Sequence, residues 1–213
     1  MNSAMDSHAT PTGDRLNTLL AASGQHALAH DLAARFGAYC ALLLRWNARF
    51  NLTSVRSEDG ILRRHFLESI ICARAIPARI YTLLDLGSGA GFPGIPIALC
   101  RPEIAVTLAE STGKKATFLR EALRVLDLKA KVHAGRAETL AVLFDAVALR
   151  AVDSMESAVS TAVGLAKVGG ILLILTTEGS AESLKTAAGE AMDWPQVLAI
   201  PGSESRILLI GKR

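Results

Sequence analysis

Cysteine residues and long apolar runs are both scarce in this sequence. The three cysteines, Cys40, Cys72 and Cys100, lie far apart, and neither a CxxC spacing nor a cluster of histidines occurs. Scattered cysteines in odd number predict a reducing compartment and argue against a disulfide framework or a zinc site. No apolar stretch reaches the roughly 18 to 20 residues that cross a bilayer. We therefore expect a cytoplasmic protein that binds no metal and no membrane.

The first residues also lack the features of a targeting segment. Residues 1–13 have neither a basic start nor an apolar run, so we expect a disordered tail rather than a signal or transit peptide. Half of the 213 residues are apolar and one fifth are charged, a composition typical of a folded domain. The length suits one α/β domain with a small extension. A net charge of +3 is compatible with a nucleic-acid partner but does not indicate one.

The hydrophobic pattern of the chain changes near residue 79. Residues 14–78 have helical periodicity without a strand signal and predict an N-terminal helical extension. Residues 79–213 contain seven short apolar runs: YTLLDL, VTLAE, KVHA, FDAVALR, GGILLILTT, QVLAIP and SRILLIG. The first five alternate with helical segments, as parallel strands covered on both faces do, and a Gly-Ser turn between the last two predicts an antiparallel pair. We expect a doubly wound, mostly parallel, seven-stranded α/β sheet.

The segment LLDLGSGAGFPGIPIAL contains the sharpest local motif. Gly87, Gly89 and Gly91 follow a buried strand and let the backbone turn without a Cβ, so a ligand can approach it closely. Counted from Gly87, a phosphate-binding GxGxxG loop would need a third glycine where Phe92 stands, so the motif fails in this register. Asp85 at the strand end can order the loop or bind the amino group of a zwitterionic sulfonium cofactor. A tight turn without a ligand is the alternative.

Polar residues also end the next three strands of the predicted sheet. The carboxylate of Glu110 can accept hydrogen bonds from the ribose hydroxyls of an adenosyl group. Ala137 and Glu138 can bind an adenine edge, although Glu138 can equally be an exposed loop acid. Arg150 can contact the cofactor or a substrate, or else cap its strand at the surface; no residue is assigned a catalytic role. These positions favour an adenosyl cofactor, and the antiparallel last strands favour a methyltransferase fold.

Together with RWNARFNLTSVR, RRHFLES, ESTGKKATFLR, GRAE and LRA, the glycine loop resembles the glucose-inhibited division protein B family, the bacterial small-subunit rRNA guanine-N7 methyltransferases. The similarity extends over residues 42–210. It implies a class I, Rossmann-like methyltransferase domain with S-adenosylmethionine as cofactor and 16S rRNA or the small ribosomal subunit as partner. We also expect a monomer. The resemblance further implies cofactor contacts at Gly87, Phe92, Ala137, Glu138 and Arg150.

The sequence departs from the family pattern at several positions. Glu68 and Glu110 stand where the family usually has aspartate, and both keep the negative charge. Thr176 and Thr177 stand where many relatives have Lys-Gly after the fifth strand, which puts in doubt any substrate contact by that lysine.

Guanine N7 has an unprotonated lone pair at neutral pH, so its methylation requires positioning rather than a general base. The sequence accordingly lacks an NPPY-type tetrapeptide for an exocyclic amine and a Pro-Cys dipeptide placed to attack a pyrimidine ring. We expect direct methyl transfer. The alternatives are a nicotinamide-dependent oxidoreductase and a non-catalytic RNA-binding module of ribosome assembly.

Basic residues before the sheet predict an RNA-binding surface. Residues 45–74 contain six arginines against three acidic residues, an excess that can contact phosphates. A solvated helix face is the alternative. Lysines at the start of the ESTGKKATFLR helix are expected to be exposed and to contact RNA as well. The residues that we expect to bind RNA are Arg56, Arg63, Arg64, Lys114 and Lys115.

Two pairs at helical spacing carry further predictions. Trp46 and Phe50 are four residues apart, which favours a packed core pair over a base-stacking platform. His65 and Glu68 are three apart and lie on one helix face, where we expect a hydrogen bond that ties this helix to the catalytic domain.

Overall fold

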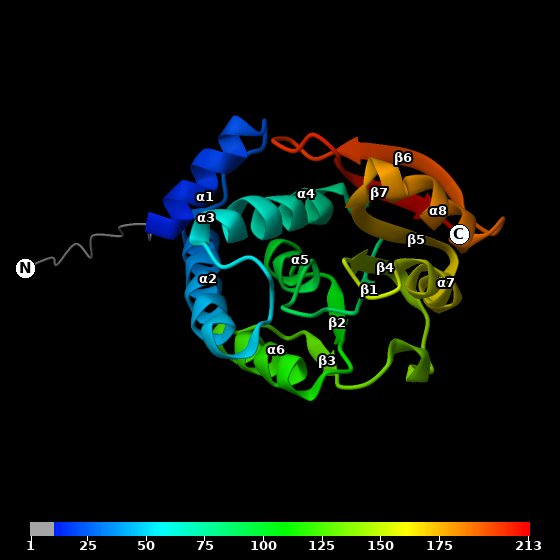
Figure 1. Cartoon of the computed structure of the whole chain (residues 1–213), viewed down its shortest axis with the longest axis horizontal. Coiled ribbons are helices and arrows are strands. Elements are labelled where there is room, and N and C mark those ends of the chain that lie inside the picture. The colour runs from blue at the N-terminus through cyan, green and yellow to red at the C-terminus, as the bar shows by residue number, and fades with distance from the viewer. Residues whose placement is uncertain (1–10) are drawn as a thin grey trace, which may run out of the picture.

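The seven predicted strands form a single sheet in the computed structural model, which describes residues 11–213 (Figure 1). Their order is β3-β2-β1-β4-β5-β7-β6. The first five strands are parallel, and β7 is antiparallel to both of its neighbours, β5 and β6. The prediction of a mostly parallel sheet that ends in an antiparallel pair is therefore confirmed. The strands are β1 (Thr82–Leu86), β2 (Ala105–Ala109), β3 (Lys131–His133), β4 (Phe144–Arg150), β5 (Ala166–Thr177), β6 (Asp193–Ala199) and β7 (Arg206–Lys212).

Helices precede the sheet and connect its strands. They are α1 (Pro11–Ala22), α2 (His30–Phe50), α3 (Glu58–Ile61), the π-helix η1 (Leu62–Leu67), α4 (Glu68–Ala75), α5 (Gly94–Cys100), α6 (Gly113–Val125), the 3₁₀ turn η2 (Ala137–Thr139), α7 (Met155–Leu165) and α8 (Glu178–Ala188). Because α1 begins at Pro11, residues 11–13 are helical rather than part of the expected tail, whose residues 1–10 lie outside the described chain. Within residues 11–213, no helix is both long and apolar enough to span a membrane.

Each face of the sheet packs against its own set of helices. Leu83 of β1 belongs to a core shared with α2, α4, α5 and α6, whereas its neighbour Leu84 faces the core beneath α7 and α8. This alternation is the two-residue period of a strand that is buried on both faces. Phe36 of α2 and Phe118 of α6 belong to the same core, so α2 packs against the helices that cover this face of the sheet, as Figure 1 shows.

The helical run before β1 contains a π-helical segment that periodicity does not predict. The run begins at Ser57, whose hydroxyl accepts a hydrogen bond from the Gly60 N–H at 3.1 Å. Residues 62–67 are π-helical, and α4 continues to Ala75. A π segment inserts extra residues into a turn and changes the direction of its side chains. The segment includes two of the predicted RNA-binding arginines and His65.

Candidate active site

A cavity of about 650 Å³ opens at the carboxyl ends of the central strands. Such an edge is where ligands bind in open parallel sheets. Seven of the nine predicted cofactor-site residues line it: Gly87, Gly89, Phe92, Glu110, Ala137, Glu138 and Arg150. Residues 52–55, which follow α2, and Arg206 of β7 line it as well. The fold thus brings together residues from seven separate segments of the chain, which include Arg64 and His65.

Asp85 and Gly91, the other two predicted cofactor-site residues, lie outside the cavity lining. Asp85 is fully buried behind the glycine loop, where its Oδ2 accepts hydrogen bonds from the Ser88 hydroxyl at 2.5 Å and the Gly94 N–H at 3.0 Å. Burial raises the pKa of Asp85 to about 6, against the opposing effect of these two hydrogen bonds. A Cβ at Gly91 would meet Ile95, away from the cavity. The first of the two roles considered for Asp85, ordering the loop, is the one that its contacts support.

Gly89 presents bare backbone to the cavity. Its φ is +58°, and a Cβ placed there would meet nothing closer than the Gly87 carbonyl oxygen at 3.8 Å. At Gly87 itself, with φ +70°, a Cβ would lie 2.8 Å from a Val152 methyl group. Glycine at position 87 therefore allows the loop to pack against the segment after β4, and glycine at position 89 leaves the cavity open in front of the backbone.

Glu110 ties together the loops that follow β1 and β2. Its Oε2 accepts a hydrogen bond from the Gly89 N–H at 2.9 Å, and its Oε1 accepts one from the Thr112 N–H at 2.7 Å. Each carboxylate oxygen retains a second lone pair for a ligand. Glu138, in the turn that follows β3, is exposed and receives a 3.5 Å contact from the Thr161 hydroxyl. At this position Glu138 can be an exposed loop acid or can contact a ligand in the cavity.

Arg150 is held in a network of buried polar groups rather than exposed as a strand cap. The Arg150 side chain is 8% exposed. One guanidinium nitrogen donates a hydrogen bond to His65 Nδ1 at 2.7 Å. The other terminal nitrogen lies 3.2 Å from a Glu68 oxygen and donates to the Arg64 carbonyl. Arg206 donates to both oxygens of Glu68 at 2.5 and 2.7 Å. The helix that contains His65 and Glu68 is thus tied to the catalytic domain, as expected, through arginines of β4 and β7.

His65 is fixed as a neutral imidazole. Because arginine can only donate, Nδ1 is the acceptor and the Nε2–H donates to the Thr53 hydroxyl at 2.8 Å. The ring stacks on Phe92 with centroids 4.5 Å apart. Burial, and then the nearby charge of Arg150, lower the pKa of His65 to about 3. Both ring nitrogens are therefore occupied, and the imidazole does not gain a proton near neutral pH.

Comparisons with known proteins identify the family of this chain. The family described as rRNA small subunit methyltransferase G matches residues 33–206. The chain belongs to this family. Ribosomal RNA small subunit methyltransferase G of Roseiflexus sp. (strain RS-1) is 39% identical over 190 residues, which cover 83% of this chain and 81% of the relative. The protein of the same name from Xanthomonas euvesicatoria pv. vesicatoria (strain 85-10) is 40% identical over 190 residues, which cover 85% of this chain and 89% of the relative. The protein is accordingly an S-adenosylmethionine-dependent methyltransferase, and the nicotinamide-dependent alternative is wrong.

Solved structures show the same fold at lower identity. The chain is similar to a predicted O-methyltransferase from Agrobacterium tumefaciens, with a TM-score of 0.59, 22% identity and coverage of 68% of this chain and 79% of that one. It is also similar to the ribosomal protein L11 methylase of Lactobacillus delbrueckii subsp. bulgaricus, with a TM-score of 0.59, 11% identity and coverage of 74% and 79%. The class I methyltransferase fold is therefore confirmed.

Within this methyltransferase fold, the predicted RNA-binding residues divide into two groups. Arg64 and Lys115 line the cavity, and Arg63 is exposed on the same π-helical segment as Arg64. Arg56 and Lys114 are exposed outside the lining; Arg56 donates to the Asn51 side chain at 2.6 Å. The basic residues therefore continue from the cavity wall onto the surface beside it.

The positions that depart from the family pattern have different consequences. Thr176 and Thr177 lie at the end of β5 outside the cavity lining, and the Thr177 hydroxyl contacts that of Ser180 at 3.2 Å. Glu68 keeps its charge and uses it to bind two arginines. Sequence analysis missed Arg206 and Thr53 as lining residues; the NLTSVR segment could have indicated Thr53, whereas Arg206 carries no local signal.

Proposed function

We propose that this protein methylates N7 of a guanine in 16S rRNA and acts in the cytoplasm. Its relatives are named as methyltransferases of small-subunit ribosomal RNA, which supports the choice of substrate. The finer proposal, N7 rather than an exocyclic amine or a ring carbon, rests on one observation. The histidine that lines the cavity, His65, has both nitrogens engaged and is neutral, so it cannot accept a proton from a substrate near neutral pH.

We propose that the cavity binds S-adenosylmethionine along the glycine loop. The open space above Gly89 admits the methionine portion against bare backbone, and the free lone pairs of Glu110 accept from the ribose hydroxyls. Ala137 and Glu138 face the adenine edge. Arg150 holds the helix that carries His65 beside this site, and Phe92 packs under the His65 ring. A cavity of about 650 Å³ lies within the range of small-molecule sites.

The chemistry follows from positioning. When bound, S-adenosylmethionine supplies a sulfonium methyl carbon, and attack by the guanine N7 lone pair breaks the S–C bond, whose electrons remain on sulfur. The chain contributes by holding both reactants in line and by excluding water. No proton has to leave the nucleophile during this step.

The decisive experiment is transfer of a labelled methyl group to 16S rRNA and to small subunits from cells that lack the protein. We expect one labelled guanine, located by borohydride and aniline scission, to which 7-methylguanosine is sensitive. Comparison of the two substrates shows whether naked RNA or an assembled subunit is methylated. Label in another base or position would contradict N7, and absence of transfer to both substrates would contradict 16S rRNA as the substrate.

The mechanism has a separate test in the pH dependence of the single-turnover rate. We expect a nearly constant rate from about pH 6 to 9 at saturating cofactor, because the nucleophile has no proton to lose and Asp85, whose pKa is raised to about 6, orders the loop rather than accepting a proton. His65→Gln should alter stability or RNA affinity more than the rate at saturating substrate. A rate that rises tenfold per pH unit near neutrality in the wild type, and loses this dependence in His65→Gln, would show that the nucleophile must first be deprotonated.

A further inference from the structure

An exposed aromatic ring lies beside the cavity at the end of α2. Phe50 is 41% exposed and is the last residue of α2. The chain continues directly into residues 52–55, which line the cavity. On the other side, Lys114 lies near the Phe50 ring, and its neighbour Lys115 lines the cavity. Two separate segments therefore connect this ring to the rim of the site.

The ring is supported from the core. The centroids of Trp46 and Phe50 are 5.2 Å apart, and Trp46 in turn contacts Phe118 edge-on at 5.6 Å. Phe118 is fully buried. The expected contact between Trp46 and Phe50 is thus present, but the expectation of a core pair is wrong for Phe50, because its ring remains open to solvent. Core packing holds the ring in place without covering it.

Positive charge surrounds this ring. The Lys114 ammonium group lies 5.7 Å from the Phe50 centroid, within the range of a cation–π contact. Among residues 11–213, neither Lys114 nor the exposed Arg49 forms an ion pair, and the nearby Glu121 is taken by Arg45 at 3.4 Å. Cations that no carboxylate neutralises can contact an anionic ligand.

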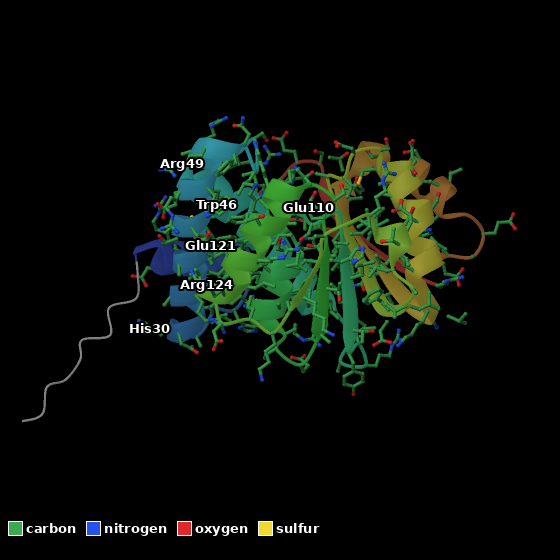
Figure 2. All side chains as sticks on the ribbon, turned by 90° about the horizontal axis from the view of Figure 1, so that it is seen from below. His30, Trp46, Arg49, Glu110, Glu121 and Arg124 are labelled. Carbon is green, nitrogen blue, oxygen red and sulfur yellow. The ribbon has the colours of Figure 1, made fainter. Side chains whose placement is uncertain are left out.

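The location agrees with a role on the substrate side of the site. In Figure 2, Trp46, Arg49 and Glu110 lie in the upper half of the view, whereas His30 at the start of α2 lies in the lower half. Glu110 follows β2, at the carboxyl edge where the cavity opens. The aromatic and basic end of α2 therefore lies near the mouth of the cavity.

We propose that Phe50, supported by Trp46, stacks on an unpaired base next to the target guanine, while Lys114 and Arg49 bind the flanking phosphates. The proposal rests on the proposed rRNA substrate. A flat aromatic surface with free cations beside it matches single-stranded RNA, which presents base faces and phosphates together. Lys114 covers the ring in the absence of RNA and moves to a phosphate when the base arrives. The surface thereby holds the target strand extended, so that the adjacent guanine can enter the cavity.

Substitution at Phe50 tests this role. Removal of an aromatic stacking residue weakens single-strand binding by about 5-fold to 100-fold. We expect Phe50→Leu to raise the KM for 16S rRNA and the Kd for a guanine-containing oligouridylate within this range, with kcat and S-adenosylmethionine affinity unchanged. Phe50→Trp should restore both values, since it retains a stacking surface. Tyr81→Leu is the matched control, because Tyr81 is 63% exposed and directly precedes β1, at the amino ends of the parallel strands, whereas the cavity opens at their carboxyl ends.

A spectroscopic readout keeps the test independent of turnover. Trp46 and Trp194 are the two tryptophans of the chain, so a Trp194→Phe background isolates the emission of Trp46. We expect the oligouridylate to quench Trp46, and S-adenosylmethionine alone to leave it unchanged. Normal RNA affinity in Phe50→Leu, or absence of Trp46 quenching by the oligouridylate, overturns the stacking proposal. Methylation of RNA by the wild type would still support the proposed function in that case. If the wild type methylates no RNA, the proposed function fails first.

Discussion

Glu68 is the carboxylate on which two arginines from distant strands converge. Its side chain is 3% exposed, and its oxygens lie 3.2 Å from Arg150 and 2.5 Å from Arg206. Glu68→Gln keeps the shape and removes the charge, which leaves the guanidinium groups of Arg150, 8% exposed, and Arg206, 27% exposed, without the carboxylate between them. Breaking a buried ion pair on one side costs about 3 kcal/mol or more. For a chain of this size we therefore expect a fall in melting temperature of about 6 to 12 °C.

Urea denaturation measures this effect directly. The midpoint for Glu68→Gln should fall at constant m-value, because the native fold is kept and only its stability changes. Glu182→Gln is the matched control: Glu182 pairs with Lys185 at 2.8 Å but is 85% exposed, and its loss should cost less than about 1 kcal/mol. Adding Arg206→Met to Glu68→Gln should recover part of the loss by relieving repulsion. Equal midpoints for Glu68→Gln and Glu182→Gln would refute this account of the network.

Three further predictions concern the loop, the imidazole and the RNA surface. Gly89→Ala and Gly24→Ala, both at positive φ with open space around the added Cβ, should each cost about 1 kcal/mol, but calorimetry should find weaker S-adenosylmethionine binding only for Gly89→Ala. Because the pKa of His65 is lowered in the fold, the unfolded chain binds a proton below about pH 6.5 and the folded chain does not, so this residue reduces the free energy of unfolding as pH falls. Between pH 6.5 and 5, His65→Gln should remove about 2 kcal/mol of the decrease in unfolding free energy that the wild type shows. An unchanged pH dependence would contradict the buried neutral imidazole. Reversing Arg63 and Arg64 to glutamate should weaken RNA binding and flatten its salt dependence, and an unchanged salt slope would place the RNA surface elsewhere.

The sequence alone determined the strands, their alternation with helices and the glycine loop, because these depend on local signals. Continuous apolar runs identify strands buried on both faces, and the Gly-Ser turn between the last two runs predicts their antiparallel pairing. Residues at the ends of successive parallel strands, such as Glu110 and Arg150, could be assigned to one edge of the sheet, since parallel strands share their direction. The RWN and NLTSVR segments gave the family, which the comparisons confirm.

Only the tertiary structure decided how these residues are used. Arg206 meets Glu68 from 138 positions away, a contact set by the place of β7 in the sheet and by the π-helical segment before Glu68. Asp85 turns behind its loop rather than into the cavity because Ser88 and Gly94 bind its carboxylate. Phe50 is exposed although its spacing from Trp46 matches a buried pair, because α2 ends there and the Lys114 side chain over its ring leaves 41% of the residue open to solvent. Periodicity records which residues share a face of one element, whereas burial and charge pairing depend on what packs against that face.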